Sequence, residues 1–245
     1  MGSGVRRWIA AVGGVCVLTL LFAGLVVRGV IRLNTPPWSR YPVRGVDVSH
    51  YQGSIDWEAL RAQGVDFAFI KATEGSSMQD DRFLQNLDGA LSAGVRAGAY
   101  HFFSFDSSGR AQAENFIRAV PLIRGMLPCA VDVEFYGDKA ANPPDVAPTR
   151  RELRALLEAL EAAYGRKPVI YATQSSYRKY VAGAFDDYDL WIRNVYLYPM
   201  MPEGRDWTFW QYSDKGKLDG CEGVEPYIDL NVFCGSEAEF EAYGR

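Results

Sequence analysis

The sequence predicts an α/β fold, namely a barrel related to the (β/α)8 type that is preceded by one transmembrane helix. Three features of the 245-residue chain support this prediction. An uncharged apolar run lies near the N-terminus. Short apolar runs then alternate with helical patterns, and the last third carries apolar runs with no long helix between them. An open doubly wound sheet is the alternative, because nothing local in the sequence excludes it.

The first feature is the run from Trp8 to Val27, which contains no charged residue. About 20 apolar residues are enough to cross a bilayer as a helix. A secretory signal would have a shorter apolar core and an A-x-A-like cleavage site, and no good site of that kind follows. We therefore expect residues 8–27 to be an uncleaved signal anchor in the cytoplasmic membrane, with residues 1–7 in the cytoplasm. Secretion after signal cleavage is the alternative.

The segment after this run is expected to be a linker, at residues 28–43. Its tandem prolines at 36–37 resist both helix and sheet. Arginines lie on both sides of the apolar run, so the positive-inside rule does not decide the orientation. The remaining residues, 44–245, suit one domain with a sizeable core.

Charge and cysteine content exclude several classes of function. The net charge is -4 and the pI about 5.3, which gives no electrostatic footprint for nucleic acid. Only two histidines and no C-x-x-C pair are present, which argues against a zinc site. No cofactor is predicted. Cys129 is expected to be a buried thiol, whereas Cys221 and Cys234 flank a predicted hairpin and are either a disulfide or independent thiols.

The middle of the chain alternates between strand and helix patterns. Apolar runs typical of buried strands lie at 45–48, 67–72, 97–102, 130–133 and 168–172. Predicted helices lie between them, at 56–63, 80–93, 110–123 and 149–164. Asp56 is a suitable N-cap for the first helix, and Gly94 and Gly165 end the second and fourth. This order implies parallel pairing with right-handed crossovers.

The last third breaks this alternation. Residues 190–195 and 208–212 are predicted strands without a long helix between them, and 218–223 with 227–233 are predicted to form a hairpin. A parallel barrel finished by a few shorter, partly antiparallel strands fits this pattern best.

Polar and aromatic residues stand where the predicted strands end, which is where barrels of this type carry their active sites. These residues are Asp47, Lys71, Glu74, Tyr100, His101, Asp132, Glu134, Tyr171, Trp191, Gln211 and Asp229. Any one of them has a structural explanation: His101 could be a satisfied buried histidine, and Lys71 with Glu74 a solvated pair. Together they predict an acidic cleft walled by aromatic side chains.

Asp132 and Glu134 are the most informative pair. Residues two apart on a strand point to the same face, so both carboxylates should face the cleft. Like charges at short range raise one pKa, so that one group holds a proton near neutral pH while the other is ionised. An acid beside a base is what cleavage of a glycosidic bond needs. An isolated D-x-E is more often a strand end with two solvated acids, but the accompanying groups favour a catalytic pair.

The composition of the predicted cleft selects a ligand class. Sugar rings stack on aromatic side chains, and their hydroxyls bind carboxylates and amides. The glycine-rich signals of a phosphate site and the G-x-S-x-G elbow of a serine nucleophile are absent from the sequence. A cation site built from Asp47, Asp132, Glu134 and Asp229 is chemically possible. The aromatic walls favour sugar over metal.

Eight ordered blocks carry a resemblance to a known family. They are G-V-D-V-S-H-Y-Q-G-S-I-D-W (45–57), F-A-F-I-K-A-T-E-G (67–75), G-A-Y-H-F-F (98–103), D-V-E (132–134), P-V-I-Y-A-T (168–173), L-W-I (190–192), W-Q-Y-S (210–213) and I-D-L-N-V-F (228–233). Over residues 44–233 the chain resembles the glycoside hydrolase family 25 lysozymes. The resemblance implies a flattened (β/α)5β3 barrel. It also implies N-acetylmuramidase activity on peptidoglycan, at the β-1,4 bond between N-acetylmuramic acid and N-acetylglucosamine.

The same resemblance implies roles for the strand-end residues. Glu134 would be the general acid, and Asp132 would stabilise the developing positive charge or orient the substrate N-acetyl group. Asp47 and Asp229 would complete the acidic floor. The residues expected to contact the sugars are Tyr100, His101, Tyr171, Trp191, Gln211, Lys71 and Glu74.

Two departures from the family pattern concern substrate preference. After L-W-I the family usually has a small residue, whereas this chain has Arg193-Asn194, and residues 135–144 form a long loop after Glu134. Because peptidoglycan lies outside the cytoplasmic membrane, we expect the domain to be extracellular, and we expect a monomer. The competing functions are a non-catalytic peptidoglycan-binding barrel anchored at the membrane and a metal-dependent hydrolase.

Overall fold

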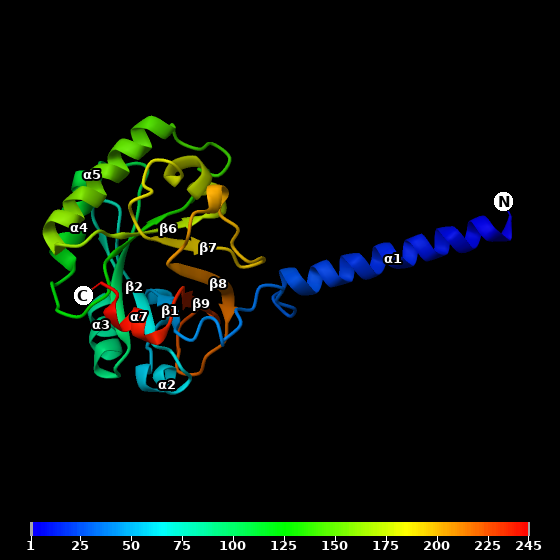
Figure 1. The fold of residues 1–245 in the computed structure, drawn as a ribbon, viewed down its shortest axis with the longest axis horizontal. Helices are drawn as coiled ribbons and strands as arrows, with labels where there is room; N and C mark the ends of the chain where they lie inside the picture. Colours follow the sequence, from blue (N-terminus) through cyan, green and yellow to red (C-terminus); the bar gives the residue numbers. More distant parts are fainter. Residues whose placement is uncertain (1, 245) are drawn as a thin grey trace.

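The computed structural model describes residues 2–244, and leaves out the side chains of residues 3, 5–7, 10, 11 and 203. The chain forms one barrel domain, from which helix α1 (Ser3–Val27) projects away (Figure 1). The barrel carries the candidate site, so its closure and its interior are described first.

The nine strands form a single sheet that closes on itself, because β1 pairs with both β2 and β9. Neighbouring strands from β1 through β2, β4, β5, β6 and β7 to β8 are parallel, and β9 is antiparallel to β8 and β1. The strands are β1 (Arg44–Val48), β2 (Phe67–Glu74), β3 (Met78–Gln79), β4 (Arg96–Phe102), β5 (Ala130–Val133), β6 (Val169–Thr173), β7 (Leu190–Arg193), β8 (Phe209–Gly216) and β9 (Ile228–Phe233). The predicted barrel is confirmed, and the open doubly wound sheet is wrong.

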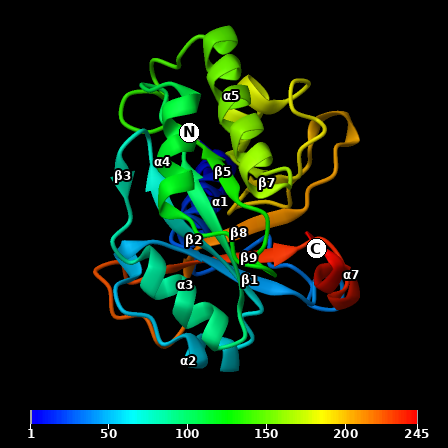
Figure 2. The same ribbon diagram turned by 90° about the vertical axis from the view of Figure 1, so that its left-hand side faces the viewer.

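Helices follow the first five barrel strands and cover the outside of the sheet, as Figure 2 shows for α3, α4 and α5. No long helix separates β7, β8 and β9, so the arrangement is (β/α)5β3. The helical segments of the domain are η1 (His50–Gln52), α2 (Trp57–Ala62), α3 (Phe83–Ser92), α4 (Gly109–Ala119), α5 (Val146–Tyr164), α6 (Gln174–Ser176), η2 (Tyr177–Val181), η3 (Pro202–Gly204) and α7 (Glu237–Ala242).

Local signals explain the helix bounds. The Asp56 side chain accepts a hydrogen bond from the Ala59 amide at the start of α2, which satisfies one of the free N–H groups there. Helix α5 buries leucines along one face, among them Leu153 and Leu160, and ends where Gly165 takes a left-handed φ of +70°. The helices thus present apolar stripes to the outside of the barrel.

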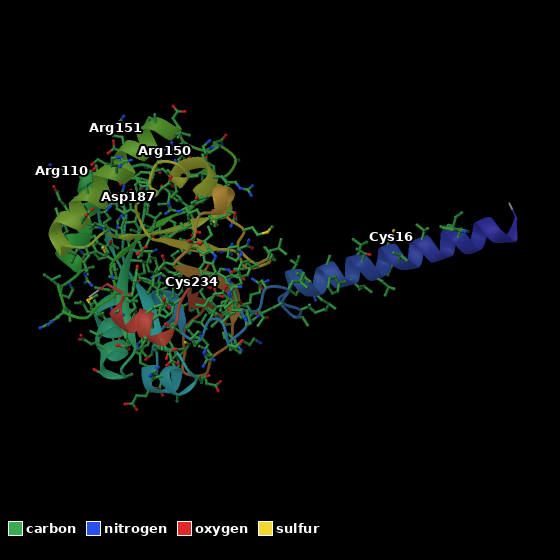
Figure 3. All side chains as sticks on the ribbon, viewed as in Figure 1. Cys16, Arg110, Arg150, Arg151, Asp187 and Cys234 are labelled. Carbon is green, nitrogen blue, oxygen red and sulfur yellow. The ribbon has the colours of Figure 1, made fainter. Side chains whose placement is uncertain are left out.

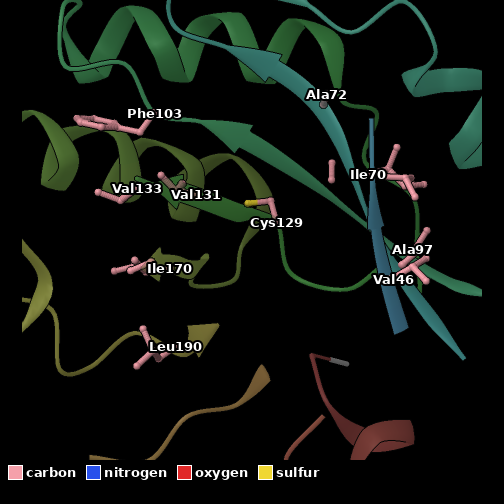
Figure 4. Close-up of a cluster of buried hydrophobic side chains, with 14 of the residues drawn as sticks. Val46, Ile70, Ala72, Ala97, Phe103, Cys129, Val131, Val133, Ile170 and Leu190 are labelled. Carbon is pink, nitrogen blue, oxygen red and sulfur yellow. The ribbon is translucent and has the colours of Figure 1, made fainter. Parts of the chain in front are cut away.

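Alternation along the strands divides the barrel into two environments. Outward-facing residues such as Ile70, Val131 and Ile170 pack under the helices (Figure 4). Inward-facing residues near the strand starts are aromatic, and the ring centroids of Phe69 and Trp191 lie 4.6 Å apart. This aromatic plug fills the lower barrel, so only the carboxyl ends of the strands are left to form a cleft.

The predicted final hairpin is placed differently in the structure. Strand β8 extends to Gly216 and itself pairs with β9, with Gly216 opposite Ile228. Residues 218–223 belong to the connection and make only an isolated bridge, between Ile55 and Cys221. The polar residues from Ser213 to Lys215 have the composition of a turn. They can nevertheless form the end of β8, because this end of the strand reaches the solvent at the barrel rim.

Of the two alternatives for Cys221 and Cys234, the disulfide is wrong, since both are free thiols. Cys221 lies in the connection before β9 and Cys234 follows its last residue, so the six residues of β9, which span about 20 Å at the usual rise per residue, lie between them. A disulfide needs Cα atoms within about 7 Å. Cys129 is buried as predicted, and burial raises the pKa of its thiol to about 12.

The segment before β1 packs against the domain. The Asn34 side chain is buried and donates hydrogen bonds to the carbonyls of Asn194 (3.0 Å) and Tyr212 (2.8 Å). The Tyr41 ring contacts those of Trp207 and Trp210. This segment therefore covers part of the outside of β7 and β8, the side of the barrel that lacks helices.

In the part of the chain that the structure describes, no helix has both the length and the apolarity needed to cross a bilayer. The predicted transmembrane anchor at residues 8–27 is therefore not supported.

We predict that Gly45→Ala destabilises the barrel. A Cβ atom at Gly45 would lie 2.4 Å from a ring carbon of Phe67, which is held in the aromatic plug. Overpacking of this kind costs about 1–3 kcal/mol, which urea unfolding can measure. Gly14→Ala is the control, because a Cβ there meets nothing within 4 Å. Equal unfolding midpoints for the two variants would contradict the prediction.

Candidate active site

A cleft of about 400 Å³ opens at the carboxyl ends of the strands, above the aromatic plug. Most of the residues predicted from the strand ends line it. The lining residues are Asp47, Val48, Ser49, Tyr51, Gln52, Lys71, Tyr100, Phe102, Asp132, Glu134, Tyr171, Trp191, Gln211, Asp214, Glu225, Tyr227 and Asp229. The cleft is acidic and walled by aromatic side chains, as the sequence predicts.

Asp132 and Glu134 both face this cleft from the end of β5, because they alternate with the outward-facing Val131 and Val133. Asp132 is buried, and its Oδ1 atom has no hydrogen-bond partner among the described residues. Burial, together with the charge of Glu134, holds the pKa of Asp132 well above its ordinary value. Burial also raises the pKa of Glu134. The pair therefore retains a proton at a pH where exposed carboxylic acids have lost theirs.

Asp47 and Asp229 form the floor of the cleft. They are paired across β1 and β9, so their side chains leave the same face of adjacent strands. The Gln211 Nε2 atom donates to both carboxylates, at 2.9 Å from Asp47 Oδ2 and 3.0 Å from Asp229 Oδ2. Asn231 donates a further hydrogen bond to Asp47 Oδ2 at 2.7 Å.

These hydrogen bonds decide which floor carboxyl group loses its proton more readily. Burial raises the pKa of both groups, but the amides of Asn231 and Gln211 and a hydrogen bond from Asp229 oppose the rise at Asp47. At Asp229 the charge of Asp47 and the bond between the two raise the pKa further. Of the two floor groups, Asp229 therefore binds its proton more tightly than Asp47 does.

Aromatic side chains orient the amides beneath the carboxylates. The Tyr171 hydroxyl donates to Gln211 Oε1 at 2.9 Å, and the Trp191 indole N–H donates to Asn231 Oδ1 at 2.8 Å. Each amide oxygen is thereby occupied, so that its NH2 group points at Asp47. Tyr171 and Trp191 thus support the floor as well as lining the cleft.

Two cations flank the acidic groups. Lys71 lines the cleft, bonds Glu74 at 2.7 Å and lies over the Phe102 ring. Arg193, the last residue of β7, bonds Asp214 at 2.7 Å. The charges of Arg193 and Lys71 both act to lower the pKa of Glu134.

His101 lies outside the cleft, which corrects its prediction as a sugar-contacting residue. It follows Tyr100 on β4, and adjacent residues on a strand point to opposite faces. Its ring is fully buried behind the strand, within hydrogen-bond distance of Thr73 (2.7 Å) and Gln112 (2.9 Å). Burial lowers the pKa of His101 to about 4, so the ring is neutral.

Glu74 does not line the cleft either, and its contact there is indirect, through Lys71. The sequence indicated Asn231 as a polar residue two positions after Asp229 on one strand, but gave it no role in the site. Sequence reasoning missed Asp214, because β8 was expected to end at residue 212. Tyr51 comes from η1 and Tyr227 from the loop before β9, and neither carries a local signal.

Among the described residues, no group of three or more His, Cys, Asp or Glu is arranged to hold a metal ion. The Asp47 carboxylate is hydrogen-bonded by protein amides and not arranged around a cation. The amide N–H groups of Gln211 and Asn231 point at its oxygens, at the positions from which a cation would bind them.

Comparison with known proteins identifies the family of this site. Residues 46–221 match the model of glycosyl hydrolases family 25. The chain belongs to this family. It is therefore a glycoside hydrolase.

Individual relatives match most of this chain. Lysozyme M1 of Streptomyces globisporus is 36% identical over 213 residues, which cover 82% of this chain and 70% of that protein. An N,O-diacetylmuramidase of Arthroderma benhamiae is 28% identical over 219 residues, 83% of this chain and 87% of that one. The structure of a family 25 glycosyl hydrolase from Bacillus anthracis superposes with a TM-score of 0.81 at 51% identity, covering 86% of this chain and 97% of that chain.

We predict that Asp132→Asn raises the free energy of unfolding at pH 7.5. The pKa of Asp132 is above the unfolded value of 3.8, so the folded state binds more protons and loses stability as the pH rises from 3.8 through the folded pKa. A neutral amide removes that loss. With about 1.4 kcal/mol for each unit of pKa difference, we expect a gain of about 1 kcal/mol or more.

The measurement is urea unfolding of the wild type and the variant at pH 5 and pH 7.5. The wild type should lose more stability between these pH values than Asp132→Asn does. Asp88→Asn, an exposed position on α3, is the control. A variant that is less stable than the wild type at pH 7.5 would contradict the prediction.

Proposed function

We propose that the protein is a muramidase that cleaves the β-1,4 bond between N-acetylmuramic acid and N-acetylglucosamine in peptidoglycan. The observation that carries this proposal is the pair of buried carboxyl groups, Asp132 and Glu134, at the end of β5 in a cleft with aromatic walls. The names of the Streptomyces and Arthroderma relatives support the same reaction. One chain supplies every lining residue, so we expect a monomer to be active.

In this proposal Glu134 is the general acid, and Asp132 is the carboxylate that stabilises positive charge or orients the N-acetyl group. Glu134 is only partly buried, whereas Asp132 lies deeper. In the free cleft the pair's proton favours Asp132, since the charge of Glu134 raises the pKa of Asp132. A bound sugar that excludes water from Glu134 shifts the proton to Glu134. Asp132 is then ionised when positive charge develops at the sugar.

The floor and the walls complete the mechanism. Asp47 is held in place by Gln211 and Asn231, and its negative charge raises the pKa of Glu134, which favours the protonated acid. Tyr100 lines the cleft beside these groups and offers its ring to the sugar, whereas Trp191 is 1% exposed and packs against Phe69 beneath the cleft. Lys71 offers a further donor to sugar hydroxyls.

The deciding experiment is digestion of purified peptidoglycan by the full chain, with mass spectrometry of the new reducing ends. We expect N-acetylmuramic acid at those ends. A non-catalytic binding barrel would sediment with the walls and create no reducing ends. Loss of activity in a chelator would favour a metal-dependent hydrolase instead.

We also propose that the domain acts on the outer side of the cytoplasmic membrane, because its substrate lies there. Protease added to intact cells from which the wall has been removed should digest the domain. A domain that stays intact until the cells are lysed would overturn this location.

Glu134→Gln should abolish cleavage while the fold is retained. The amide has the size of the acid but no proton to give to the leaving oxygen, and general acid catalysis contributes about 10²- to 10⁴-fold. Turbidity of purified walls measures the loss, with circular dichroism as the folding control. A folded variant with more than about a tenth of wild-type activity would remove Glu134 from this role.

Asp47→Asn should move the alkaline limb of the pH–rate profile to lower pH. The Asp47 charge raises the pKa of Glu134, so a neutral amide lets Glu134 lose its proton earlier as the pH rises. The measurement is the rate of wall digestion from pH 4 to pH 9 for both proteins. An alkaline limb that does not move, or that moves to higher pH, would show that the charge of Asp47 does not raise the pKa of Glu134.

A further inference from the structure

Arg193 ends β7, two residues after Trp191, so it leaves the same face of the strand. Trp191, the register partner Gln211 and the ion-pair partner Asp214 all line the cleft. The guanidinium therefore stands at the edge of the cleft, beside the residues that enclose the sugar.

Most of the hydrogen-bonding capacity of Arg193 is unused. A guanidinium has five N–H donors, and among the described residues Asp214 is the one acceptor that hydrogen-bonds it. The side chains of Arg193 and Asp214 are 31% and 34% exposed, so solvent reaches the pair. A carboxylate of the substrate can therefore join or replace Asp214 in the paired geometry that guanidinium groups favour.

The second cation of the cleft is less available for this task. The Lys71 side chain is 9% exposed, bonds Glu74 and lies over the Phe102 ring. The remaining charged groups nearby are acidic and repel anions. An anionic substituent that enters the cleft is thus favoured at the Arg193 edge.

We propose that Arg193 recognises a carboxylate carried by the muramic acid unit of the substrate and so determines substrate preference. The carboxylate is that of the lactyl group, where the peptide has been removed, or one of those on the stem peptide. This inference rests on the proposed muramidase function and adds a substrate class to it.

Recognition at Arg193 also acts on the catalytic acid. The groups that face Glu134 are Asp47 on β1, Lys71 on β2, Asp132 on its own strand and Arg193 on β7. Arg193 is the charge that most lowers the pKa of Glu134. A bound carboxylate offsets that charge and favours the protonated acid. Anionic substrates are then cleaved faster as well as bound more tightly.

The test uses four glycan substrates: strands with stem peptides and strands freed of peptides by an amidase, each with its carboxylates intact or converted to methylamides. For the wild type we expect kcat/KM to be about tenfold or more higher on the intact form, as expected for a hydrogen bond between charged groups. A preference within the peptide-free pair indicates that Arg193 binds the lactyl carboxylate. A preference within the peptide-bearing pair indicates that it binds a carboxylate of the stem peptide. In Arg193→Gln the ratio of kcat/KM on intact substrate to kcat/KM on amidated substrate should fall towards one.

Two further variants sharpen the test. Asp214→Asn removes the competing carboxylate and should increase the preference for intact substrates. Arg110→Gln is the matched control, since Arg110 lies on the outside of the domain (Figure 3), 87% exposed. Its preference should equal that of the wild type. The alkaline limb of the Arg193→Gln profile should also move to higher pH, which a purely structural role would not produce.

An unchanged preference in a folded Arg193→Gln protein would overturn the inference, as would a wild type that cleaves intact and amidated strands equally. Equal loss of cleavage on all four substrates would also overturn it, because Arg193 would then act in folding or in the chemistry. A wild type that cleaves none of the substrates would instead refute the proposed function.

Discussion

The hydrogen-bonded carboxyl group of Asp47 connects the fold to the site. It lies on β1, the strand that closes the barrel by pairing with β2 and β9. It receives hydrogen bonds from Gln211 on β8 and Asn231 on β9, and each of these amides is oriented by an aromatic donor. The closure of the barrel therefore sets the position of the charge that raises the pKa of Glu134.

This arrangement is poor for stability and useful for chemistry. Burial raises the pKa of four of the carboxyl groups that line the cleft, and Asp132 has an oxygen without a described partner. A protein selected for stability alone would replace such groups with apolar or amide side chains. The aromatic plug and the helix layer hold the strands in register and so keep the carboxyl groups close together.

The regular part of this fold and its charged cleft could be predicted from the sequence. Apolar runs in β2, β5 and β6 end in Lys71, Asp132 and Tyr171, and parallel strands bring such ends together. The sequence did not show which of two adjacent residues faces the cleft. Tyr100 and His101 are adjacent on one strand, so only one of them could do so.

The errors lie where the fold has no repeating pattern. Asp214 was missed because β8 continues into polar residues at the rim, where burial no longer marks a strand. The disulfide alternative for Cys221 and Cys234 followed from the same error, since it assumed a hairpin beyond β8. The packing of Asn34 and Tyr41 against the barrel depends on contacts with residues more than 150 positions away, which local patterns do not reveal.

In the proposed mechanism the two halves of the barrel have different tasks. Acid chemistry is assigned to residues on β1 and β5, whose parallel neighbours and covering helices resemble those of any regular barrel. Substrate recognition is assigned to the side without helices, where β7 ends in Arg193 and the next carbonyl, of Asn194, accepts from Asn34 and Trp210. The segment before β1 therefore holds the edge of the cleft in place. Sequence changes there can alter substrate preference while the acid pair and its floor stay intact.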